Sequence, residues 1–436
     1  MRWFPYPIAL CVVFVLVACS PAKKPQSNPQ ETQTLKPHDQ RTTDSLRDCP
    51  DALPQTDSVM LKRWPYLQSV SSNRATVVFG TQSDTAQPSL VIHNRDQQRA
   101  QVPAHIETPI PSLGMTLWSA VLEGLPADSA ICYSVLIDDV VVGGPFSFHT
   151  APTDLSSQSQ FIVLGDYGAG TNEQRQLATA IAHLTPQPDF LLTTGDNAYP
   201  QGSHLQWQQN VFDIYREQWT KQPLFPSPGN HDYYTQNAQP YLDNMVLPRQ
   251  ARRDADQERY YSFDWGSVHI AVLDTEQPLL YCAMGNDDDM LHWLQSDLEN
   301  SSAPWNIVAL HRPPYSGHPS RVPPAVLVQK FIPVFEQMGV DIVFSGHDHF
   351  YELFNAIKKN KQVPHSDGGV VYLTTGGGGR ALYPIGTHPL RTNAIVAHHF
   401  VQALASQTTL TVNIIGLDGD VLDSIHLANR VSPSQQ

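Results

Sequence analysis

FIVLGDYG, residues 161–168, indicates most directly how this chain folds. A short, continuous run of apolar, β-favouring residues ends in a glycine turn that carries a carboxylate, Asp166. Continuous apolar runs of this length are typical of strands buried on both faces, as in α/β proteins. In open α/β sheets, ligands bind beyond the carboxyl ends of the strands, which is where Asp166 stands. We therefore expect a buried strand that delivers an acidic side chain to a ligand site.

Four further polar clusters repeat this arrangement, and the runs DFLLTT, NIVAL and DIVFS read as further buried strands. The clusters are Gly195-Asp196-Asn197-Ala198-Tyr199, Gly229-Asn230-His231-Asp232, His311 after the run 306–310, and Gly346-His347-Asp348-His349. One Gly-Asp pair after a strand is usually a turn, but turn formation does not explain the whole series. Carboxylates, an amide, a phenol and imidazoles together suit two transition-metal ions. The series predicts a two-metal hydrolase.

The order GD-x-G, GD-x-x-Y, GNH-[ED], H and GH-x-H resembles that of the calcineurin-like metallophosphoesterases, specifically their purple acid phosphatase branch. The resemblance covers about residues 160 to 420. Tyr199, placed after Asp196, marks the branch, because most metallophosphoesterases have no tyrosine ligand there. Asp232 stands where many relatives carry Glu, and that position is not a ligand in the family.

The resemblance implies a ligand role for seven side chains around two metal ions. One ion would be bound by Asp166, Tyr199 and His349, the second by Asn230, His311 and His347, and Asp196 would bridge both. A phenolate favours a hard trivalent ion, so Fe(III) is expected at the Tyr199 site. An amide and two neutral imidazoles suit Zn, Mn or Fe(II) at the second site.

The implied activity is that of an acid phosphatase that hydrolyses phosphate monoesters by attack of a metal-bound hydroxide. The substrate would be a small-molecule phosphate ester. A phosphodiesterase that acts on lipid headgroups or nucleotides is one alternative, because the same two-metal site can perform both reactions. The other alternative is a non-enzymatic surface adhesion lipoprotein with a relic site, and the intact ligand set argues against it.

Two histidines are candidates for the acid that protonates the leaving group. His231 directly follows Asn230 and matches the family motif residue for residue, whereas His318, in HRPPYSGH, rests on an approximate loop alignment and is equally explained as a solvated loop histidine. Arg312 beside Pro313-Pro314 has two interpretations, a phosphate contact or a loop cap, and we leave it outside the expected site.

The start of the chain predicts export. Residues 1–18 have the short apolar core of a signal peptide, and Leu16-Val17-Ala18-Cys19 resembles the bacterial lipobox, which implies lipid attachment at Cys19. An uncleaved anchor or an ordinary signal peptide is the alternative. Ser20 after the cysteine favours the outer membrane of a Gram-negative cell. Residues 19–58 have almost no large apolar side chains, so we expect a disordered tether to a bacterial membrane.

The expected fold class is mixed, with a β-sandwich followed by an α/β domain. Alternating runs and turn signals in residues 59–152 predict the sandwich, and its ends resemble the fibronectin-III-like domain of purple acid phosphatases. Residues 159–430 would form the metallophosphoesterase αββα sandwich, closed by a hairpin that turns at Asp418-Gly419.

Thr171 with Gln174 predicts a capped helix start, and Asp287-Asp288-Asp289 predicts another. Gly376–Gly379 lacks a P-loop signature, so we expect a loop close to the metals.

Composition limits the remaining possibilities. The net charge is −14 and no basic stripe compensates it, which argues against nucleic acid as a partner.

Once the signal peptide and the lipid account for two cysteines, Cys49, Cys132 and Cys282 remain. An exported protein permits one disulfide among them, and the sequence does not select the pair.

Overall fold

The computed structural model describes Cys49 and residues 61–82, 87–93, 99–276 and 287–430. The expected signal peptide, the lipidation site at Cys19, almost all of the expected tether and Cys282 lie outside these residues. Within them, no helix combines the length and the apolar character that crossing a bilayer requires.

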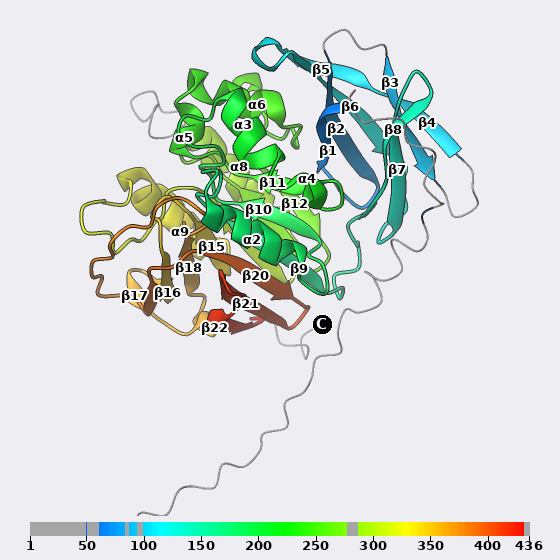
Figure 1. Ribbon diagram of the computed structural model, residues 1–436. Coiled ribbons are helices and arrows are strands. Elements are labelled where there is room, and N and C mark those ends of the chain that lie inside the picture. Colours follow the sequence, from blue (N-terminus) through cyan, green and yellow to red (C-terminus); the bar gives the residue numbers. More distant parts are fainter. Residues whose placement is uncertain (1–48, 50–60, 83–86, 94–98, 277–286, 431–436) are drawn as a thin grey trace, which may run out of the picture. The chain divides into compact units, whose positions relative to one another are not determined.

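The first described domain is a sandwich of two antiparallel sheets, as the alternating runs predict (Figure 1). Its turn at Asp138 and Asp139 has positive φ at both residues, 50° and 61°, which suits a tight hairpin. Side chains from both sheets, such as Val77 and Tyr133, belong to one core. The sheet orders are β1 (Leu61–Gln68), β2 (Arg74–Gln82), β6 (Met115–Glu123), β5 (His105–Ile110), and β4 (Arg99–Pro103), β3 (Pro88–His93), β7 (Ala130–Ile137), β8 (Val140–His149).

The disulfide that the sequence left open joins Cys49 to Cys132. Cys132 lies in β7 and is buried, so the bond fastens the chain before the sandwich to the sandwich core.

The second domain contains two further sheets in its described part. In one, β9, β10 and β11 are parallel, and in the other β13, β14, β15 and β18 are parallel. The first sheet has the order β11 (Leu224–Pro226), β10 (Phe190–Thr193), β9 (Ser159–Leu164), β20 (His399–Ala405), β21 (Thr409–Gly416), β22 (Val421–Ala428). The second has the order β12 (Tyr261–Trp265), β13 (Val268–Val272), β14 (Trp305–Ala309), β15 (Ile342–Ser345), β18 (Val370–Thr375), β16 (Tyr351–Lys358), β17 (Lys361–Gln362), with β19 (Asn393–Ile395) beside β16. The predicted closing hairpin is β21 with β22.

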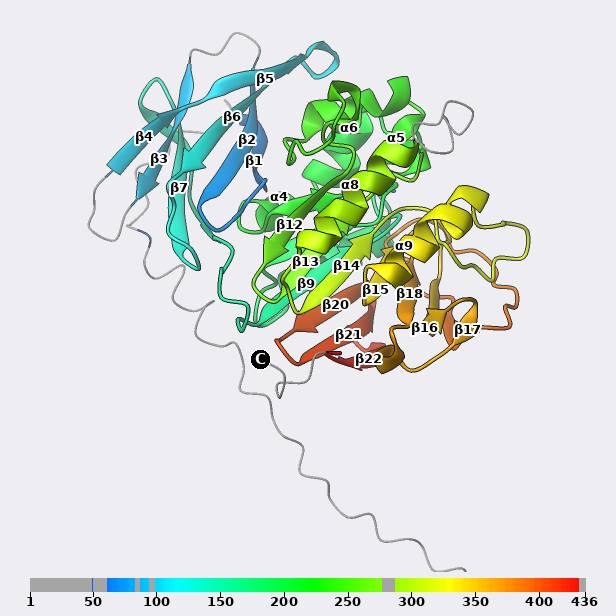
Figure 2. The same ribbon diagram turned by 180° about the vertical axis from the view of Figure 1, so that it is seen from behind.

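Neighbouring residues of the buried strands point into different cores. Ile307 belongs to the core that includes β9 and β10 side chains, and Val308 belongs to the core formed with α8 and α9. Both faces of this sheet are therefore covered, which explains why its strands are continuously apolar. Helix α2 (Asn172–Ala182) lies over the other sheet, and α8 (Asp287–Asn300) and α9 (Ile332–Gln337) lie on the opposite side (Figures 1 and 2). The predicted αββα sandwich is confirmed.

The two predicted helix starts are present. The Thr171 hydroxyl accepts the N–H of Gln174 at 3.2 Å, and the Gln174 side chain accepts the N–H of Gly170 at 2.7 Å, one residue earlier than a standard capping box. Helix α8 begins at Asp287. The short helices between the strands are α3 (His204–Trp207), α4 (Arg216–Trp219), α5 (Asn230–Tyr233) and α6 (Gln239–Asn244).

A buried arginine joins the sandwich to the second domain, and the described residues of both belong to one compact unit. Arg63 in β1 is 1% exposed and donates to Gln208 at 2.8 Å and to Asn244 at 2.6 Å. Its guanidinium also lies 3.7 Å from the centre of the Phe212 ring. Burying a charge is costly unless it is hydrogen-bonded, and these partners offset part of that cost, while Nη2 of Arg63 is buried without a hydrogen-bond partner among the described residues.

We expect Arg63→Ala to lower the free energy of unfolding by about 3 kcal/mol, because Oδ1 of the buried Asn244 would lose its donor and the packing of the side chain against Phe212 would be lost. Chemical denaturation measures this change. Arg74→Ala, which alters an exposed residue of β2, is the control and should change stability by less than about 0.5 kcal/mol. Equal unfolding midpoints for the two variants would contradict the role assigned to Arg63.

Candidate metal centre

The polar clusters meet where strands of both sheets end. Asp166 and Asp196 follow β9 and β10, and His311 follows β14 of the other sheet. His347 and His349 follow β15, and Asn230 is the first residue of α5, shortly after β11. Because parallel strands present their carboxyl ends at one edge of a sheet, the two packed sheets bring these side chains together.

One group of donor atoms surrounds the phenol of Tyr199. Its hydroxyl lies 2.9 Å from a carboxylate oxygen of Asp166 and 2.9 Å from Oδ2 of Asp196. Nε2 of His349 lies 3.2 Å from the same hydroxyl and 3.2 Å from Asp166. All four side chains are buried. Asp166, Tyr199 and His349 are the residues that the resemblance assigns to the first ion, and Asp196 is the expected bridging ligand.

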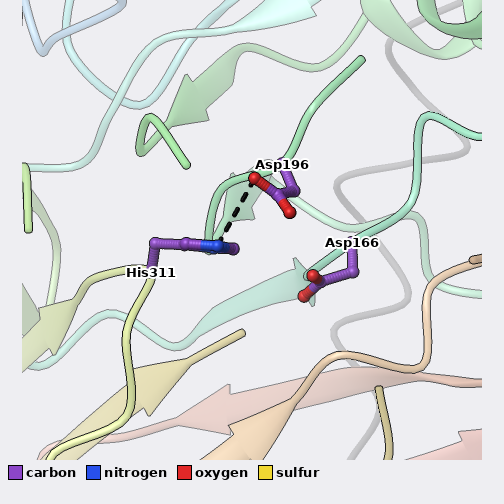
Figure 3. A group of neighbouring side chains, drawn as sticks. All are labelled: Asp166, Asp196 and His311. Atoms are coloured by element: carbon purple, nitrogen blue, oxygen red, sulfur yellow. Dashed lines mark ion pairs between the residues drawn. The ribbon is translucent and has the colours of Figure 1, made fainter. Parts of the chain in front are cut away.

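A second group surrounds the imidazole of His311, which is fully buried. Its Nε2 lies 3.0 Å from Oδ1 of Asn230, 3.2 Å from Nδ1 of His347 and 3.4 Å from Oδ1 of Asp196. Figure 3 shows Asp196 and His311 turned toward each other, with Asp166 facing the same space. Asp196 therefore contributes one oxygen to each group, which is the geometry that a bridging ligand needs.

Backbone carbonyls fix the orientation of two imidazoles. Nδ1 of His311 donates to the carbonyl of Thr194 at 2.8 Å, and Nδ1 of His349 donates to the carbonyl of Ala381 at 2.7 Å. In a neutral ring, Nε2 then carries the lone pair, and in both residues Nε2 faces the donor groups. This arrangement is typical of metal-binding histidines.

Three of the acidic and imidazole side chains are held by strained backbone. Asp166, Asp196 and His347 have φ values of 56°, 52° and 68°, in the left-handed region that residues with a Cβ rarely adopt. Such conformations persist where the surrounding structure enforces them, and they concentrate at functional sites.

The electrostatics of the site favour a bound cation. Burial and the negative charges of Asp166 and Asp196 raise the pKa of Tyr199 well above its ordinary value, so without a cation the phenol stays protonated. Burial and the neighbouring charges of His311 and Arg312 lower the pKa of His347, so that ring is neutral and free to bind metal. One oxygen each from Asp166 and Asp196 and one nitrogen of His311 lie within 4.8 Å of one another. The donor set therefore fits metal ions of the expected kinds.

The two candidate acids occupy different positions. His231 lies in the site, since its ring centre is 4.4 Å from that of Tyr199, and its Nδ1 donates to the carbonyl of Pro200 at 2.6 Å. That bond leaves Nε2 directed to the site, 3.9 Å from Asp196. His318 meets the ring of Tyr383 edge-on, with ring centres 5.6 Å apart. Tyr383 in turn stacks on His349 at 3.9 Å.

Cationic side chains around the site were outside the expected set. Arg312 lies 3.1 Å from Nε2 of His347, and the guanidinium of Arg380 lies 5.1 Å from the centre of the Tyr199 ring. Arg321 donates to Asp348 at 3.0 Å and to Tyr383 at 3.2 Å. Only Arg312 carried a sequence signal, its position directly after His311.

The glycine loop 376–379 passes close to the centre, as expected. The N–H of Gly378 donates to the carbonyl of Gly165 at 3.0 Å, and a Cβ on Gly376 would lie 3.0 Å from Oδ2 of Asp166.

Comparison with known proteins agrees with this geometry. Residues 159–351, which contain all of the donor side chains, match the family described as calcineurin-like phosphoesterase. This part of the chain is therefore similar in sequence to calcineurin-like phosphoesterases and to purple acid phosphatases. The whole described fold of that domain, from β9 to β22, extends beyond the matched range.

Curated relatives of the phosphoesterase domain include plant purple acid phosphatases. The chain is 27% identical over 249 residues to purple acid phosphatase 22 of Arabidopsis thaliana, covering 54% of each protein. It is 26% identical over 245 residues to purple acid phosphatase 1 of Ipomoea batatas, covering 51% of this chain and 50% of that protein. The chain thus spans about half the length of these relatives.

Among solved structures, purple acid phosphatase PPD1 from yellow lupin (Lupinus luteus) seeds is similar in fold, with a TM-score of 0.71 and 17% identity. That similarity covers 84% of this chain and 74% of the lupin chain.

We expect Gly346→Ala to weaken metal binding by about tenfold or more, because its Cβ would lie 2.6 Å from Oδ2 of Asp166 and displace that carboxylate. Elemental analysis after dialysis against defined metal concentrations measures the loss. Gly416→Ala is the matched control, since its Cβ would meet only Leu422 side-chain atoms, at 3.3 to 3.4 Å. Undiminished metal content in Gly346→Ala would show that Asp166 is not a ligand.

Proposed function

We propose that this protein hydrolyses phosphate monoesters with two metal ions held in the centre described above. The main support for the proposal is that Asp196 contributes one carboxylate oxygen to each of two donor groups, one around Tyr199 and one around His311. A shared carboxylate between two such groups is what a two-metal phosphoesterase requires. The plant relatives, named as purple acid phosphatases, support the same reaction class.

The chain's own residues supply binding, orientation and a proton. When bound, the two ions would hold the phosphate oxygens and acidify a water molecule to form the nucleophile. Nε2 of His231 faces the site while Nδ1 is held by Pro200, so His231 is placed to give a proton to the departing alkoxide. His318 contacts Tyr383, whose ring stacks on His349, and is the second candidate for this proton transfer.

The donor set also supports the identity of the first ion. A phenolate and a carboxylate favour a hard trivalent cation, so we propose Fe(III) beside Tyr199 and Zn, Mn or Fe(II) beside His311. Burial and the charges of Asp166 and Asp196 raise the pKa of the phenol, and a trivalent cation would oppose this shift. Deprotonation of Tyr199 would therefore accompany binding of the ion.

We expect Asp196→Asn to reduce kcat for a phosphate monoester by at least about a thousandfold, because both donor groups lose their shared charge. Turnover of a chromogenic monoester measures this, with circular dichroism to check the fold. Asp264→Asn, which alters a carboxylate that is 76% exposed and outside the centre, is the control. Monoester hydrolysis by Asp196→Asn at the wild-type rate would refute the bridging role. A wild-type preference for diesters over monoesters would contradict the proposed substrate class.

Purified protein should show a visible tyrosinate-to-iron absorption band, and Tyr199→Phe should remove it. The phenol oxygen is the atom that would bind iron, and the substitution deletes that atom while keeping the buried ring. Metal analysis alongside the spectrum tests the assignment. Two divalent ions without colour would exclude Fe(III) at this site, and a band retained in Tyr199→Phe would assign the colour to another residue.

A further inference from the structure

Arg312 is held at the edge of the metal centre by a bidentate ion pair. Its Nε and Nη2 donate to the two carboxylate oxygens of Glu276 at 2.8 and 2.9 Å, and its backbone N–H donates to Thr275 at 3.1 Å. The Glu276 side chain is 7% exposed and that of Arg312 24%. This two-point contact fixes the plane of the guanidinium as well as its position.

Buried residues in turn support Glu276. Its backbone N–H donates to Asp274 at 2.9 Å, and the other Asp274 oxygen accepts the hydroxyl of Tyr233. Arg259 donates to the same hydroxyl at 2.7 Å and lies 3.9 Å from Asp274. This hydrogen-bond network holds Glu276 in place, so the guanidinium of Arg312 has little freedom to turn away from the metal centre.

The third guanidinium nitrogen of Arg312 is directed into the site. Glu276 does not use Nη1, which lies 3.1 Å from Nε2 of His347. Nδ1 of His347 faces His311 at 3.2 Å, so Nδ1 is the atom that this ring offers to an ion. Once Nδ1 binds a cation, the ring proton is on Nε2, and two N–H donors then face each other. Nη1 needs a different acceptor, and a substrate phosphate would supply one.

The neighbouring arginine is placed differently. Arg321 gives Nη1 to Asp348 and to the carbonyl of His347, and gives Nη2 to Tyr383, so both of its terminal nitrogens already have acceptors. Arg312 is thus better placed than Arg321 to donate to a bound anion.

We propose that Arg312 contacts the substrate phosphate and favours dianionic monoesters over monoanionic diesters. The inference rests on the proposed function and adds a residue that selects within it. A monoester brings one more negative charge and more unesterified oxygens to a fixed guanidinium than a diester does, so its attraction to Arg312 is stronger.

The test compares Arg312→Ala, Arg312→Gln and Glu276→Gln with the wild-type protein loaded with metal. Inorganic phosphate is the probe, its affinity is measured by calorimetry, and metal content is measured on the same samples. Arg249→Ala is the control for loss of a positive charge, because Arg249 is 61% exposed and pairs with Glu258, which is not part of the metal centre.

We expect both Arg312 variants to bind phosphate about ten- to hundredfold more weakly while both ions are retained, since one charge-assisted hydrogen bond is lost. Glu276→Gln should show a smaller loss, and Arg249→Ala should match the wild type. The value of kcat/KM should fall more for a monoester than for a diester. If Arg312→Ala does not fold, Arg312→Gln, which preserves more of the side-chain volume, gives the same comparison.

Three results would overturn the proposal or its selectivity. Unchanged phosphate affinity with both ions retained would show that Arg312 does not contact the anion, and loss of metal would show that it acts through His347. Equal losses for monoester and diester would overturn the selectivity. A wild-type protein that binds both ions and phosphate but turns over no monoester would contradict the proposed function, while phosphate affinity would still decide the role of Arg312.

Discussion

The two oxygens of Asp196 are the constraint on which the site depends. Oδ2 faces Tyr199, and Oδ1 faces His311 and also accepts the backbone N–H of His231 at 2.8 Å. One carboxylate can serve two donor groups only if strand ends of both sheets meet at its position. The packing of the two sheets, the left-handed backbone at Asp196 and the placement of His231 are therefore parts of a single geometric requirement.

That requirement places charged groups in the interior, where they are costly. Asp166 is fully buried, and although burial alone would raise its pKa, the hydrogen bond and charge of His349, with His311 and Tyr199, lower it. Without a cation, the hydrogen bonds and charge interactions around Asp166 thus favour its anionic form despite burial. Strained backbone and buried charge are tolerated at a site when they serve ligand binding, and the continuous apolar cores around the strands provide the compensating stability.

Much of the fold was predictable because local patterns agree with tertiary packing. The run Ile307–Leu310 is apolar on both faces, since neighbouring residues enter different cores, and every residue of the run Phe161–Leu164 is buried in one core. The turn at Asp138-Asp139 and the helix start at Thr171 follow from side-chain and backbone preferences that act over a few residues. The pairing of Cys49 with Cys132 was not predictable, because the separation of two cysteines along the sequence does not determine how close they lie in space.

The sequence by itself determined which donor types stand at the strand ends and in what order. It could do so because each cluster is a local motif: a run that forms a strand, followed by a turn that carries a polar side chain. The tertiary structure decided which donors share a neighbourhood, that Tyr383 contacts both His318 and His349, and that Arg312 turns one nitrogen toward His347. These relations join residues from different strands and loops, and only the packing of one sheet against the other sets them.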